Sequence, residues 1–277
     1  MKGISTARIR SIAGNFYLVL IMIFLYAPIF TLVVLSFNSS KSRARWGGFT
    51  LDWYQDLFTS AQILSAFRNT LLIAFLSALI ATVIGTVAGI GIHELRRFPK
   101  TIVMGVNNIP MLNADIVTGI SLMLAFLAFG ISLGFHTILI SHITFNIPYV
   151  ILSVMPKLKQ TSKYTYEAAL DLGATPLRAF FKVIFPDILP GVLSGFLLAF
   201  TMSLDDFIIT HFTKGAGMNT LSTLIYSEVR KGIKPSMYAL STIIFGAVLF
   251  LLLVANFAPQ RTNQKSSSLF GEAGKKV

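Results

Sequence analysis

Long apolar runs recur along this 277-residue chain, and they constrain its fold more than any other feature. A helix needs about 20 mostly apolar residues to cross the hydrocarbon core of a bilayer. Only 12% of the residues are charged, about half the share found in soluble domains. The sequence therefore predicts an all-α, polytopic transmembrane helical bundle. About six spans are expected, at residues 14–37, 66–92, 102–130, 135–156, 188–212 and 236–258.

Polar residues and prolines interrupt the third and fourth of these predicted spans. They are Pro110, Asn113, Asp115, Asn146 and Pro148. Such residues are tolerated at membrane depth where they face protein or a water-filled cavity. We therefore expect both spans to face protein or a cavity at these positions.

A cleaved signal peptide is the alternative explanation of the N-terminus, because Lys2, Arg8 and Arg10 precede an apolar run. That run extends from Phe16 to Phe37, which is longer than the roughly 7–15 apolar residues of a signal peptide. No small-residue cleavage site follows it. We therefore expect a retained first span.

The basic residues are distributed unevenly between the two sides of the predicted bundle. With the N-terminus inside, 15 of the 23 Lys and Arg residues lie on the cytoplasmic side and 8 on the other. Cytoplasmic loops of membrane proteins carry such an excess, so both termini are predicted to be cytoplasmic. The same rule explains the net charge of +12 without a nucleic-acid partner, since no basic stripe is interleaved with aromatic residues.

These patterns divide the chain into three parts. The parts are a cytoplasmic N-terminus at 1–13, a transmembrane domain at 14–258 and a polar, disordered cytoplasmic tail at 259–277. Two outer segments carry further signals. Residues 38–65, with Trp46, Trp53 and Tyr54, suit an interfacial aromatic belt or a platform for an external partner. Residues 213–235 suit a short surface helix.

The transmembrane domain contains a cytoplasmic loop at 157–187 that includes EAALDLGATPLRAFFKVIFP. Its first part is rich in Ala and Leu, which favour a helix, and Gly173 can end that helix. Thr175 and Pro176 suit the N-cap and first position of a second helix, which Pro186 is expected to end. The sequence predicts two short helices joined at a glycine.

Two patterns bear on whether a partner meets this loop. Glu167 and Asp171 are four residues apart, and a like-charge pair at this spacing disfavours an isolated helix by a few tenths of a kcal/mol. The second helix carries an apolar stripe at Leu177, Phe180, Phe181 and Ile184. Docking of a partner and a solvated cap of the bundle both remain open from these residues alone.

The loop resembles the EAA loop of ABC-type importer permeases. The shared pattern is Glu167-Ala168-Ala169, then Gly173 after three residues and Val183-x-Phe185-Pro186 after nine more. The family pattern ends in Ile-x-Leu-Pro, so Val183 and Phe185 are conservative departures. The resemblance implies the type I importer permease architecture and a loop that docks on a cytoplasmic ATPase. The residues it assigns to coupling are Glu167, Ala168, Ala169, Asp171, Gly173 and Pro186.

We recognise no catalytic motif in this sequence. The sequence contains no G-x-x-x-x-G-K-[ST] phosphate loop and no cysteine, and no nucleophile–base pair is readable. Its four histidines lack metal-ligand spacing, and we expect them to be local hydrogen-bond partners. We predict no catalytic residue, metal site or cofactor here, with ATP and magnesium bound by a partner ATPase.

Three carboxylates, Asp115, Asp205 and Asp206, lie within or near the predicted spans. An Asp at the centre of a membrane helix costs about 2.5–3.5 kcal/mol, so it usually lines a cavity or has a partner. An inward-facing carboxylate favours a cationic substrate. Asn146 and Tyr149 are further candidates for lining a pathway. The alternative for positions 205 and 206 is a pair of interfacial acids anchored by Lys214 or by water.

The string AFTMSLDDFIITHFT resembles the spermidine/putrescine branch of the importer permeases, in particular the permease labelled C. WGGFTLDWYQDLF and NTLSTLIYSEVRKGIKP share this resemblance, which covers nearly the whole chain. It implies a subunit of a polyamine importer in the bacterial cytoplasmic (inner) membrane. The implied partners are ATP-binding cassette ATPase subunits, a second homologous permease and an extracytoplasmic polyamine-binding protein.

Two alternatives remain open. The same architecture could import another cationic solute or ferric ion. A secondary transporter could instead use Asp115 and Asp205 or Asp206 for ion coupling. Such a transporter needs no docked ATPase, so Glu167→Lys would leave its transport intact. Inverted repeats would favour it, and none is visible in the sequence.

Overall fold

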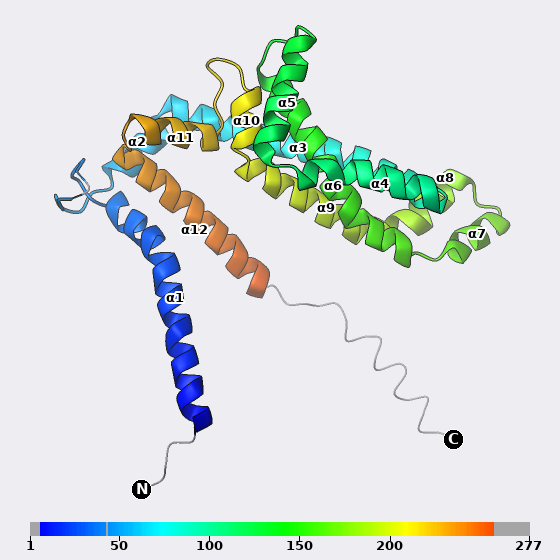
Figure 1. The fold of residues 1–277 in the computed structure, drawn as a ribbon, viewed down its shortest axis with the longest axis horizontal. Coiled ribbons are helices and arrows are strands. Elements are labelled where there is room, and N and C mark those ends of the chain that lie inside the picture. Colours follow the sequence, from blue (N-terminus) through cyan, green and yellow to red (C-terminus); the bar gives the residue numbers. More distant parts are fainter. Residues whose placement is uncertain (1–5, 43, 258–277) are drawn as a thin grey trace. The chain divides into compact units, whose positions relative to one another are not determined.

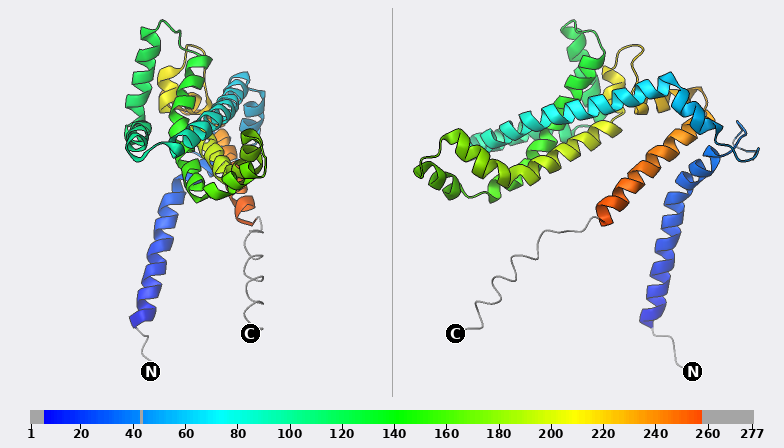
Figure 2. Two further views of the ribbon diagram at one scale, coloured as in Figure 1. Left: turned by 90° about the vertical axis from the view of Figure 1, so that its right-hand side faces the viewer. Right: turned by 180° about the vertical axis from the view of Figure 1, so that it is seen from behind.

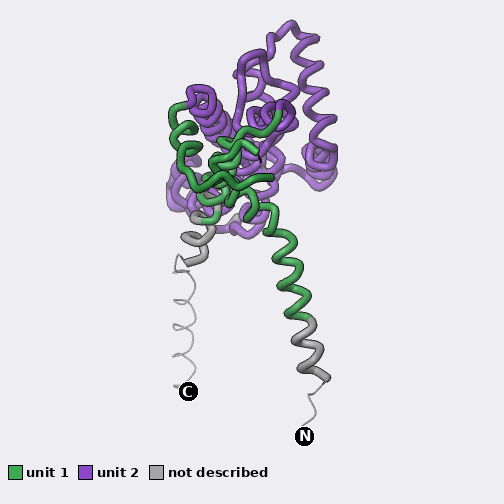
Figure 3. The backbone as a smooth tube through the Cα atoms, turned by 90° about the vertical axis from the view of Figure 1, so that its left-hand side faces the viewer, with its two compact units in different colours: residues 1–59, 232–277 green, residues 60–231 purple. Residues whose placement is uncertain are grey.

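A computed structural model describes residues 6–42 and 44–257 of the chain. All regular elements in these two ranges are helices, which confirms the all-α prediction. The chain forms two compact units, residues 1–59 with 232–277 and residues 60–231 (Figure 3). The predicted tail at 259–277 lies outside the described residues, as do the first five residues of the predicted N-terminal segment.

The described residues of the first unit form three helices (Figure 1). They are α1 (Thr6–Ser36), α2 (Asp52–Thr59) and α12 (Pro235–Phe257), with α12 packed against the other two. Asn38 organises the loop before α2, because its backbone carbonyl accepts a 2.7 Å hydrogen bond from Trp53 Nε1. Tyr54 bonds Ser36 Oγ at 2.7 Å. Trp53 and Tyr54 therefore fasten this loop, whereas the Trp46 side chain is 54% exposed.

The second unit is centred on three long helices that lie side by side (Figure 2). They are α3 (Ala61–Glu94), α6 (Phe135–Gln160) and α9 (Phe185–Asp205). Their shared core contains Ala78, Val150, Val154, Ile188 and Ala199, all fully buried. The remaining elements are α4 (Arg97–Leu112), α5 (Asp115–Ala128), α7 (Lys163–Asp171), α8 (Pro176–Ala179), the π-helix η1 (Phe180–Ile184), α10 (Ile208–Thr213) and α11 (Leu221–Lys231). α11 confirms the short helix expected within 213–235.

Small residues allow the three core helices to pack closely. A Cβ atom added at Gly85 of α3 would lie 2.8 Å from Val150 Cβ of α6. One added at Gly195 of α9 would lie 3.3 Å from the Val150 backbone on the opposite side. Helices in membranes use such residues to approach one another. Gly85 of α3 and Gly195 of α9 therefore both lie directly against Val150 of α6.

Gly85→Ala is expected to destabilise the second unit by about 1–3 kcal/mol, the usual cost of overpacking a core. Gly91→Ala on the same helix is the matched control, because its added Cβ would meet no atom within 4 Å. Thermal unfolding in detergent should lower the Tm of the first variant and leave or raise that of the second. Equal Tm values would contradict the close approach.

Most predicted spans correspond to helices of the structure. Within residues 6–42 and 44–257, four helical segments are long and apolar enough to cross a membrane, at Gly14–Ser36, Ala61–Glu94, Phe135–Gln160 and Pro176–Asp205. They match the first, second, fourth and fifth predicted spans. The sixth prediction, 236–258, coincides with α12. α6 continues without a break through Pro148 and Pro156.

The third predicted span, at 102–130, is a pair of helices with a sharp bend between them. α4 and α5 together are apolar enough, but they meet at an angle of 103°. Asn113 and Ala114 both have extended backbones at this break, with ψ angles of 151° and 137°. Asp115 then begins α5, where a negative side chain is favourable beside the helix N-terminus. The polar residues expected to interrupt the span therefore mark a bend.

The prediction that Pro186 ends the second loop helix is wrong. α8, η1 and α9 form one continuous helical segment that includes Pro186. Proline normally breaks a helix, because it lacks an N–H and its ring crowds the carbonyl four residues earlier. Here a π-helical turn precedes it, in which Phe185 N–H donates to Phe180 O, five residues back. This wider turn leads directly into Pro186 near the start of α9.

The fifth span does not continue to residue 212 as predicted. α9 ends at Asp205, and Asp206 has an extended backbone with ψ of 125°. A separate short helix, α10, begins at Ile208. The side chain of Asp206 supplies the reason for this break, as described below.

Candidate functional site

The predicted cytoplasmic loop forms the two helices expected at its centre, α7 and α8. Gly173 ends α7 with a φ of 85°, a left-handed conformation that glycine adopts at little cost. Gly173 N–H donates to Leu170 O at 2.9 Å, and Ala174 N–H donates to Ala169 O at 3.0 Å. These two bonds satisfy carbonyl groups at the helix end. Thr175 and Pro176 stand at the predicted N-cap and first position, although the Thr175 side chain makes no capping bond.

The four residues of the apolar stripe predicted for the second helix have two different environments. Phe180 and Ile184 line a pocket of about 580 Å³ beneath the loop. Leu177 and Phe181 are instead 73% and 59% exposed, and Leu172 at the end of α7 is 90% exposed. We call Leu172, Leu177 and Phe181 the loop patch. It presents large apolar side chains on a loop between two membrane-spanning helices.

Glu167 contributes to the same pocket together with Tyr166, and His93 and Glu94 line it from the end of α3. The pocket is therefore bounded by the loop on one side and by the ends of membrane helices on the other. Ala168 and Asp171 are exposed on α7. Pro186 is exposed near the start of α9.

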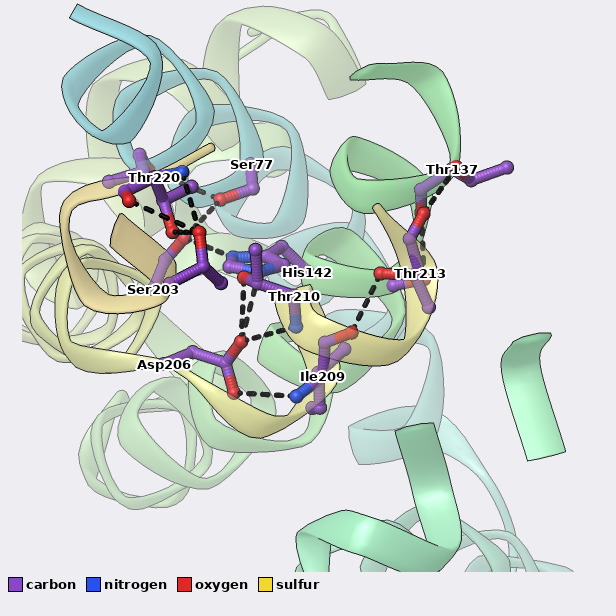
Figure 4. Close-up of polar contacts among 12 residues, drawn as sticks. Ser77, Thr137, His142, Ser203, Asp206, Ile209, Thr210, Thr213 and Thr220 are labelled. Atoms are coloured by element: carbon purple, nitrogen blue, oxygen red, sulfur yellow. Dashed lines mark hydrogen bonds and ion pairs between the residues drawn. The ribbon is translucent and has the colours of Figure 1, made fainter. Parts of the chain in front are cut away.

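Asp206 lies at the centre of a buried polar cluster (Figure 4). Its Oδ2 accepts hydrogen bonds from the Thr210 backbone N–H and from Thr210 Oγ1, both at 2.8 Å. Its Oδ1 accepts a 3.2 Å bond from the Ile209 N–H. His142 Nε2 lies 3.3 Å from Oδ2, and the Asp206 side chain is only 8% exposed. Asp206 therefore holds the first turn of α10 and separates it from α9.

His142 extends this cluster to the core helices. Its Nδ1 bonds Ser203 Oγ of α9, and Ser203 Oγ lies 3.0 Å from Ser77 Oγ of α3. Its Nε2 lies 2.9 Å from Thr210 Oγ1. Figure 4 shows the imidazole between the two serines and the α9–α10 break. The expectation that His142 is a local hydrogen-bond partner is confirmed.

The neighbouring carboxylates have different surroundings. Asp205 and Asp115 are both exposed, and Tyr149 of α6 is half-buried. His142 and Thr210, and not Lys214, contact Asp206. Lys214 donates a 2.7 Å hydrogen bond to Asn219 Oδ1, and burial lowers the pKa of its ammonium group.

Asn146 lies elsewhere, inside the packed core. It is 0% exposed, and neither atom of its amide has a hydrogen-bond partner among the described residues. It lies one helical turn from both His142 and Val150 on the same face of α6. An unsatisfied buried polar group costs about 1–3 kcal/mol. In this conformation Asn146 is enclosed by the packed core of the second unit.

Sequence reasoning missed Ser77, Ser203 and Thr210 as members of the polar cluster. Serine and threonine are common in membrane helices, so each residue carries little information alone. The available signal was a few polar residues within otherwise apolar spans, with Ser77 in the second predicted span and both Ser203 and Thr210 in the fifth. Recognising it requires the register between the helices, which only the packed structure supplies.

Comparisons with known proteins agree with this architecture. Residues 81–263 match the family of binding-protein-dependent transport system inner membrane components. Spermidine/putrescine transport system permease protein PotC of Escherichia coli (strain K12) is 39% identical over 245 residues, which cover 88% of this chain and 92% of PotC. Putrescine transport system permease protein PotI of the same strain is 38% identical over 254 residues, covering 87% and 89%.

Among solved structures, a bacterial ABC transporter involved in the import of the acidic polysaccharide alginate has a similar fold. The TM-score is 0.68 at 14% sequence identity, and the match covers 95% of this chain and 100% of that one. This similarity shows a shared fold and carries no information on substrate. The match over residues 81–263 and the identity to PotC and PotI establish that the chain belongs to the family of binding-protein-dependent transport system inner membrane components.

Proposed function

We propose that this chain is a transmembrane permease subunit of an ATP-driven importer for polyamines of the spermidine and putrescine class. One observation carries the proposal. PotC and PotI are both named for polyamine transport, and they are 39% and 38% identical to nearly the whole of this chain. The subunit would span the bacterial cytoplasmic membrane several times and form half of the translocation pathway.

The exposed carboxylates support a cationic substrate. Asp115 is exposed at the bend between α4 and α5. Exposed Asp205 lies at the end of α9. We assign Asp115 as the first cation-binding position and Asp205 as a second.

The loop patch supports docking of a separate ATPase. Apolar side chains of this size are seldom exposed together without a partner surface, and Leu172 is 90% exposed. The partner would bind ATP and magnesium, while this subunit makes no catalytic contribution. A second homologous permease would complete the pathway, and an extracytoplasmic binding protein would deliver the polyamine.

The continuous helix formed by α8, η1 and α9 supports a route for coupling. It begins in the cytoplasmic loop at Pro176 and ends at Asp205. A displacement of the loop by the ATPase would therefore be transmitted along one rigid element to the α9–α10 break. ATP binding would shift the population between inward- and outward-facing states by favouring one of them.

Uptake of labelled spermidine tests the proposal directly. Cells expressing the complete transporter are compared with cells that lack only this chain, with unlabelled putrescine, arginine and ferric ion as competitors. We expect uptake that requires this chain and is competed by putrescine alone. An assembled complex that shows no chain-dependent polyamine uptake would overturn the substrate assignment. Competition by arginine or ferric ion would redirect it to another cation.

A further inference from the structure

Groups of this chain bind both carboxylate oxygens of Asp206. An ionised carboxylate offers about four lone-pair positions. Three are taken by the N–H groups of Ile209 and Thr210 and by the Thr210 hydroxyl. His142 Nε2 also lies 3.3 Å from Oδ2, and the Asp206 side chain is only 8% exposed. Unlike the exposed Asp115 and Asp205, Asp206 is therefore bound within the chain and almost inaccessible to a substrate.

The hydrogen positions in this cluster follow from its donors. The Thr210 hydroxyl has one hydrogen, which it donates to Asp206 Oδ2. His142 Nε2 must therefore donate to Thr210 Oγ1, 2.9 Å away. His142 Nδ1 is then left to bond Ser203 Oγ on α9. The imidazole thus joins the first turn of α10 to the packed core helices.

Helix α10 in turn packs closely against α5. A Cβ atom added at Gly119 of α5 would lie 3.2 Å from the Phe212 ring and 3.4 Å from Ile209 Cα. Gly119 lies four residues, about one helical turn, after Asp115. The far end of α10 is also fastened, because Thr137 Oγ1 of α6 donates to Thr213 O at 2.7 Å. Contacts therefore lead from His142 and Asp206 through α10 to the start of α5.

We propose that His142 and Asp206 are positioning residues for transport. They hold α10 against α5 and so fix the bend between α4 and α5, where Asp115 lies, without touching the substrate themselves. The inference rests on the proposed function in one respect, the assignment of Asp115 as a cation-binding carboxylate.

A double-mutant cycle on spermidine uptake separates positioning from direct contact. Asp206→Asn is expected to raise KM about tenfold, within the range of ordinary coupling between sites, with Vmax changed less than twofold. In an Asp115→Asn background the same substitution should change KM little further. Thr144→Val is the control, since its hydroxyl only bonds the Ile140 carbonyl on an exposed face. Effects of Asp206→Asn and Asp115→Asn that multiply independently would overturn the proposal.

A second measurement does not depend on the substrate. The chain contains no cysteine, so Asn113→Cys places a single thiol at the bend, where the side chain is exposed. Its reaction rate with a charged, membrane-impermeant thiol reagent is measured in the assembled transporter. Asp206→Asn and His142→Gln should each change the rate several-fold, whereas Thr144→Val should not. An unchanged rate would refute positioning, even if the transported cation were not a polyamine.

Discussion

Leu177→Glu is expected to abolish ATP-driven uptake while the membrane helices remain folded. Leu177 is 73% exposed, so the substitution removes few contacts within this chain. In a docked complex the lost burial is worth about 1.5–3 kcal/mol, and an unpaired carboxylate in the interface costs about as much again. Since about 1.4 kcal/mol is a factor of ten in affinity, ATPase binding should weaken by about a hundredfold or more.

Co-purification of the ATPase with membranes, together with spermidine uptake, checks this result. Leu177→Met is the matched control, because it preserves the apolar volume and should retain both binding and transport. Unchanged uptake by Leu177→Glu would contradict docking at the loop patch. It would favour the alternative of a transporter that works without an ATPase.

Asp115→Asn is expected to raise the KM for spermidine by about 10–100-fold. A hydrogen bond to a charged group is worth about 1.5–3 kcal/mol, and the substitution removes the charge while keeping the shape. Asp115 is exposed at the α4–α5 bend, so its loss should not unfold the chain.

Initial uptake rates over a range of spermidine concentrations give this KM. Asp52→Asn is the control, since Asp52 is an exposed carboxylate of α2 in the other unit. An unchanged KM for Asp115→Asn would indicate that Asp205, and not Asp115, is the principal cation-binding carboxylate. A lower Vmax at constant KM would instead indicate a role in the conformational change.

The conformation of the loop at 157–187 was predictable because it depends on local chemistry. Gly173 favours the left-handed residue that ends α7, and Pro176 suits the first position of a helix. These preferences act over a few residues and need no contacts from distant parts of the chain. The effect of Pro186 was not predictable in the same way. A π-helical turn precedes Pro186 and lets the helix continue, and such turns have no simple sequence signal.

The two helix breaks were only partly predictable. Asn113 and Asp115 identified where the third span is interrupted. The angle of 103° between α4 and α5 could not be predicted, because hydropathy is the same for a straight and a bent helix. The end of α9 was missed altogether. It depends on Asp206 binding the first turn of α10 and His142, which is 64 residues earlier in the chain.

The sequence by itself determined the membrane class, most of the spans, the two helices of the loop at 157–187 and the family, since these depend on hydropathy, short-range preferences and a spaced motif. Only the tertiary structure distinguished the three carboxylates. Asp205 and Asp206 are adjacent in sequence, yet one is exposed and the other is 8% exposed beside His142. That difference arises from the register of α3, α6 and α9, which long-range packing decides.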